Sequence, residues 1–158
     1  MSIFLLILSF SAAFTAGSAN TAASLGELRI SGEEDQAMHL HGGAAAQLGQ
    51  ASFSLKNSGK PTALSVTQVE FLTGSDCDVP PEAVQSEPSV VGLSLEERQG
   101  PSKLLEIPNG KHDLKVYFAH VPATYSHCDR FAFRVSFESD GQQAVVVSET
   151  HVERVTDG

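Results

Sequence analysis

Cationic side chains are scarce in this sequence. Ten Lys and Arg stand against 19 Asp and Glu, which gives a formal net charge of -9 at pH 7. The segment from Met1 to Ser24 carries no charged side chain, so the whole charge lies in the remainder of the chain. Nucleic acids and anionic membrane surfaces need clustered Lys and Arg. The composition therefore argues against both kinds of partner. An acidic surface is compatible with binding cations or basic partners, or with a charge that serves only to keep the domain soluble.

Recognisable catalytic signatures are also lacking. No local pattern places a nucleophile beside a base, and the acidic pairs at Glu33–Asp35 and Glu96–Glu97 fall where turns or exposed strand ends are expected. The segment "HGG" is followed by "AAAQLG", which has neither the Lys nor the spacing of a phosphate-binding loop. We therefore predict that the protein is not an enzyme.

The first residues have the pattern of an export signal. An apolar run from Ile3 to Phe10 is followed by small residues, with Gly17 and Ala19 placed as a peptidase cleavage site requires. We expect a signal peptide over residues 1–19, a flexible mature N-terminus over 20–26 and one domain over 27–158, secreted or periplasmic and without an integral membrane segment. A membrane anchor is the alternative, because the uncharged stretch just reaches the roughly 20 residues that span a bilayer.

The two cysteines, Cys77 and Cys128, are an even number in a chain expected in an oxidising compartment. Such a count most often means one disulfide. A bridge that closes about 50 residues would stabilise the fold by roughly 3 to 5 kcal/mol in the chain-entropy model. The alternative is a thiolate metal site, for which His127 directly precedes Cys128.

Residues after Leu25 alternate between apolar and polar and show no helical periodicity. In "ASFSLKN" (51–57) the apolar residues occupy every second position, as a half-buried strand requires. In "ALSVTQVEFL" (63–72) this phase slips by one near Thr67 and Gln68, which predicts a bulge. Seven or eight such strands, with turn residues between them, predict an all-β fold: an antiparallel immunoglobulin-like or cupredoxin-like β-sandwich.

The pairing register of the last two strands can be predicted from the turn between them. The pair Asp140-Gly141 suits a two-residue type I′ hairpin turn. Such a turn places Phe137 opposite Ala144 and Val135 opposite Val146, with Ser148 opposite Phe133.

The stretch "AMHLHGG" (37–43) contains the main candidate for chemistry. On a strand His39 and His41 project from one face, roughly 6.5 to 7 Å apart at Cα, which is near enough to hold one ion. Met38 joins them only if the backbone bends, which the two glycines after His41 make easier. Imidazole and thioether ligands favour copper or zinc. The alternative is that both histidines are solvated residues of an edge strand.

Three segments resemble the periplasmic copper-A chaperones: "ASFSLKNSGKPTALSVTQVEF", "LEIPNGKHDLKVYF" and "DRFAFRVSFESDGQ". They follow the family's order of a strand with an Asn-containing turn, a Pro-Gly turn before a His-bearing strand, and a Phe-rich strand with a Gly turn. The resemblance implies a copper site of histidines and methionines in which His112 occupies the late histidine position. Leu114 stands where that family has methionine, and no methionine follows Met38, so the resemblance bears mainly on the fold.

Two functions from different classes follow. The first is a noncatalytic binding module for a protein partner, in which the histidines are incidental. The second is a copper-binding or copper-delivery protein, in which His39 and His41 anchor the metal and His112 or another histidine completes the site. Metal binding that is lost in a His39→Ala, His41→Ala double variant would distinguish the second from the first.

Overall fold

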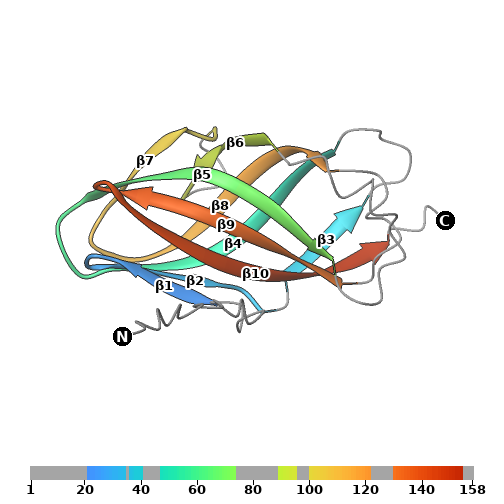
Figure 1. Ribbon diagram of the computed structural model, residues 1–158, viewed down its shortest axis with the longest axis horizontal. Helices are drawn as coiled ribbons and strands as arrows, with labels where there is room; N and C mark the ends of the chain where they lie inside the picture. Colours follow the sequence, from blue (N-terminus) through green and yellow to red (C-terminus); the bar gives the residue numbers. More distant parts are fainter. Residues whose placement is uncertain are drawn as a thin grey trace, which may run out of the picture.

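The computed structural model describes residues 21–34, 36–40, 47–73, 89–95, 100–121 and 130–154. These residues form ten strands in two five-stranded sheets that pack face to face (Figure 1). No helix in this part of the chain is long and apolar enough to cross a membrane. The strands are β1 (Ala22–Leu25), β2 (Leu28–Gly32), β3 (Gln36–Leu40), β4 (Gln47–Asn57), β5 (Thr62–Thr73), β6 (Ser89–Ser94), β7 (Leu104–Ile107), β8 (Gly110–Val121), β9 (Arg130–Ser139) and β10 (Gln142–Arg154).

The strand order is that of an immunoglobulin-like sandwich. The first sheet has the order β1-β2-β4-β8-β6 and the second has β3-β10-β9-β5-β7. Strands β2, β4, β8 and β6 correspond to A, B, E and D of a constant-type immunoglobulin domain, and β5, β9 and β10 correspond to C, F and G. Strands β1, β3 and β7 are additions at the sheet edges. The predicted fold class is therefore confirmed.

The core is built by the alternation that the sequence displays. Ala51, Phe53 and Leu55 of β4 are buried, while Ser54 and Lys56 between and beyond them are exposed. The Phe53 ring meets the Phe137 ring edge-on across the two sheets, with centroids 5.1 Å apart. Such aromatic pairs add to the free energy gained from burying the rings themselves.

The β9–β10 hairpin has the predicted register. Phe137 pairs with Ala144, Val135 with Val146 and Phe133 with Ser148. Asp140 has φ of 48° and Gly141 has φ of 74°, which are the two positive values that a type I′ turn needs. The predicted phase slip in β5 is also confirmed, as a register shift between Val66 and Gln68 where β5 pairs with β9.

Three details differ from what the sequence predicted. Ala22–Leu25, expected within a flexible terminus, form strand β1, which pairs with β2 because the turn at Gly26 and Glu27 folds them into a hairpin. The sheets are also not wholly antiparallel, and the described residues contain ten strands where seven or eight were expected. Strand β3 runs parallel to β10 because the chain leaves the first sheet after Gly32 and joins the edge of the second.

Candidate functional site

Three cationic side chains lie in one line across the outer face of the first sheet. Arg29 of β2 pairs with Lys56 of β4, and Lys56 pairs with Lys111 of β8. All three are exposed. We call these three residues the basic row. Neighbouring strands are roughly 4.8 Å apart, so the row extends about 10 Å from β2 to β8.

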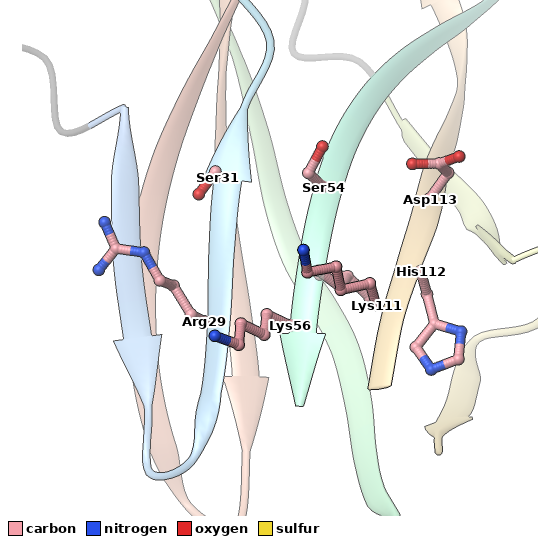
Figure 2. Close-up of a pocket in the computed structure, with 8 residues that line it drawn as sticks. Arg29, Ser31, Ser54, Lys56, Lys111, His112 and Asp113 are labelled. Carbon is pink, nitrogen blue, oxygen red and sulfur yellow. The ribbon is translucent and has the colours of Figure 1, made fainter. Parts of the chain in front are cut away.

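Hydroxyl groups and one carboxylate form a second line beside the basic row. Ser31 pairs with Ser54, and Ser54 pairs with Asp113. The two lines border an open groove of about 500 Å³. Figure 2 shows Lys111 lying over β4 and Lys56 directed toward β2, while the His112 ring is directed away from the row.

The alternation of the strands forces these cations to the surface. Leu28, Ile30 and Leu55, which flank Arg29 and Lys56, are buried in the core. Arg29 and Lys56 therefore take the opposite face of their strands. Lys111 shares this face because it pairs directly with Lys56. The register of three strands then brings them together, although they are far apart in the sequence.

The side chains of the basic row make no ion pair or hydrogen bond with any other side chain in the described part of the chain. Like charges directly opposite each other destabilise a sheet. The arrangement is therefore unfavourable for the isolated fold and favourable for a bound anion, which the cations would attract and the serine hydroxyls would contact.

Sequence reasoning missed this site because it depends on strand pairing. Each cation stands alone in its own segment, in "LRI", "LKN" and "GKH". The alternation of apolar and polar residues could have placed each cation on the outer face of its strand. Their alignment in one row depends on the pairing registers of β2 with β4 and of β4 with β8.

The predicted histidine site lies elsewhere and is partly described. Met38 and His39 belong to β3, at the edge of the second sheet, where Met38 pairs with Val152 and His39 with Glu153 of β10. The two are consecutive residues in an unbroken pairing with β10. His41 lies outside the described residues.

The structure does not bring His112 near His39. His112 belongs to β8 in the first sheet, at its start beside the turn after β7, and that turn and β3 lie at opposite ends of the molecule (Figure 1). The His112 Nε2 atom is 3.0 Å from the Pro108 carbonyl oxygen and 3.3 Å from that of Asn109. A carbonyl oxygen only accepts, so Nε2 carries the proton and donates it within the turn.

No group of three His, Cys, Asp or Glu placed to hold a metal is found among the side chains that the structure describes. Cys77 and Cys128 lie outside the described residues, and so do residues 1–19 of the predicted signal peptide. The disulfide and the export signal stay predictions.

No protein-family model and no curated protein matches this chain. Solved structures similar to it include a family 123 glycoside hydrolase from Clostridium perfringens, with 6% identity, a TM-score of 0.37 and coverage of 80% of this chain and 24% of that one. The chain thus spans about a quarter of that hydrolase's length. The ASH/PapD-like domain 7 of human CEP192 has 13% identity, a TM-score of 0.32 and 99% coverage of both chains. The GAE domain of GGA2p from Saccharomyces cerevisiae has 16% identity, a TM-score of 0.26, and coverage of 87% and 100%.

Proposed function

We propose that this protein is an exported, noncatalytic binding module that holds an acidic segment of a protein partner in the groove along the basic row. The observation that carries the proposal is the direct pairing of Arg29 with Lys56 and of Lys56 with Lys111. Three aligned cations without side-chain partners in the described structure are complementary to carboxylates.

The shape of the site supports a chain-like ligand. The groove is open and lies on the outer face of the first sheet, where an extended acidic segment can cross the strands and meet the cations in turn. Ser31 and Ser54 offer hydroxyl donors beside them.

Binding of a labelled Glu-rich peptide, followed by fluorescence anisotropy at several salt concentrations, tests the proposal. We expect affinity to fall steeply with salt and to fall roughly tenfold or more in Lys56→Glu, whose side chain is central in the row. Lys60→Glu is the matched control, because Lys60 is exposed but does not line the groove. Equal binding by the wild type and Lys56→Glu would refute the site.

A second function, copper binding or delivery with His39 and His41, is favoured by one observation. The parallel pairing of β3 with β10 places His39 directly beside Glu153. The resemblance to copper-A chaperones belongs to this second proposal.

A further inference from the structure

We infer that Asp113 makes the groove selective for an acidic segment that also carries a basic residue, an inference that rests on the first proposed function and specifies its partner. The acidic side chains of this segment lie along the basic row, and its basic side chain pairs with the Asp113 carboxylate. The ligand is then a segment of mixed charge and not a run of acidic residues alone.

Strand pairing places Asp113 beside the basic row, on the same face of the first sheet. Asp113 follows Lys111 by two residues on β8, and residues two apart on a strand share a face. It pairs with Ser54 of β4, as Lys111 pairs with Lys56. The Asp113 side chain is exposed and lines the groove. A ligand that reaches Lys111 therefore also meets a carboxylate.

The Asp113 carboxylate makes no ion pair or hydrogen bond with the groups that the structure describes. Figure 2 shows why Lys111 does not pair with it: the Lys111 side chain extends over β4, whereas Asp113 stays over β8. Lys115, two residues further along β8, has an interaction of its own. The groove thus presents separate positive and negative groups, each available to a ligand of opposite charge.

The distances suit one extended segment. The basic row spans about 10 Å, and an extended chain advances roughly 3.4 Å per residue, so about four residues cross it. Asp113 and Lys111 are alternate residues of one strand, and such residues are roughly 6.8 Å apart at Cα. A lysine at the end of the segment can cover this distance with its flexible four-carbon stem.

The position of Asp113 also selects the direction in which the segment lies. An acidic segment that ran along β8, and not across the strands, would bring one of its carboxylates next to Asp113. Repulsion between the two carboxylates disfavours that orientation, and it equally disfavours negative charge that continues past the row. Specificity of this kind combines an attractive contact for the right ligand with a repulsive one for the wrong ligand.

Fluorescence anisotropy at low salt with two labelled peptides tests the inference. One peptide has four Glu followed by Lys, and the other has four Glu followed by Gln. We expect the wild type to bind the Lys-ended peptide roughly two- to fivefold more tightly, which is the effect of one exposed ion pair. Asp113→Asn should abolish this preference, because it removes both the attraction for Lys and the repulsion of extra negative charge.

Glu149→Gln is the matched control for Asp113→Asn. It also removes one negative charge, but Glu149 is exposed on β10 of the second sheet and does not line the groove. This variant should therefore keep the preference for the Lys-ended peptide. Circular dichroism of each variant shows whether it is folded.

The outcomes separate the role of Asp113 from the function on which it rests. Equal binding of the two peptides by the wild type, with both lost in Lys56→Glu, overturns the role of Asp113 and leaves the basic row as the binding site. A preference that persists in Asp113→Asn, or that Glu149→Gln reduces equally, also overturns that role. Failure of both peptides to bind the wild type overturns the proposed function and this inference together.

Discussion

Lys56 and Lys111 occupy directly opposed positions on the antiparallel strands β4 and β8, and Arg29 opposes Lys56 from the other side. Like charges directly opposed on neighbouring strands destabilise a sheet. Lys56 takes part in both pairs. Both pairs of like charges are kept without a counter-ion among the described side chains. They lower the stability of the sheet at the same place where they attract an anion.

Replacing Lys56 by Gln is therefore expected to stabilise the protein by a few tenths to about 1 kcal/mol, because it removes both repulsive pairs while keeping much of the side chain's length. Urea unfolding measures the change. The gain should shrink at high salt, which screens exposed charges. Lys60→Gln, outside the row, should change stability little, and a destabilised Lys56→Gln variant would contradict our account of the row.

Asn57 joins the β4–β5 turn to β7 and should be needed for stability. Its Nδ2 donates to the carbonyl oxygens of Lys60 at 2.8 Å and Ile107 at 2.9 Å, and its Oδ1 accepts from the Gly59 amide at 2.9 Å. The side chain is buried. Asn57→Ala leaves buried partners unsatisfied and should lower the free energy of unfolding by roughly 1 to 3 kcal/mol.

Asn109→Ala provides the comparison for Asn57. The Asn109 Nδ2 also donates to a turn carbonyl, that of Gly59, at 2.9 Å, but this hydrogen bond is exposed. Water can replace it, so the loss should be well under 1 kcal/mol. Thermal unfolding that shows equal losses in the two variants would mean that burial of Asn57 is not what matters.

Much of the fold was predictable because local patterns determine it. The alternation in β4, the slip near Gln68 and the Asp140-Gly141 turn each follow from the geometry of a few neighbouring residues. The register of the last hairpin follows from its turn alone.

The candidate sites were not predictable to the same extent, because they depend on pairing between distant segments. Nothing local to "AMHLHGG" reveals that Glu153 pairs with His39, and nothing near Lys56 reveals Arg29 or Lys111. The expected role of His112 came from family order, whereas its contacts with Pro108 and Asn109 come from the turn that carries the chain from β7 in the second sheet to β8 in the first.

Gly32 marks the point where the chain leaves the first sheet for the second, and it should tolerate no side chain. A Cβ atom there would lie 2.0 Å from the Val147 carbonyl oxygen, which is backbone and cannot turn aside. Gly32→Ala should destabilise the protein by roughly 1 to 3 kcal/mol or more. Gly100→Ala, where a Cβ meets nothing within 4 Å, is the control, and equal melting temperatures of the two variants would contradict the close approach.

The described strands also bear on the predicted disulfide. Thr73, four residues before Cys77, pairs with Phe131, three residues after Cys128, so the two cysteine-bearing segments leave neighbouring strands at the same end of the second sheet. This placement favours a bridge between them. Peptide mapping under non-reducing conditions should find Cys77 linked to Cys128, and reduction should lower the free energy of unfolding by roughly 3 to 5 kcal/mol. The Cys77→Ser, Cys128→Ser variant should match the reduced protein and be insensitive to reductant. Two thiols that react freely in the folded, oxidised protein would instead leave the cysteines available as metal ligands, the alternative that His127 beside Cys128 raised.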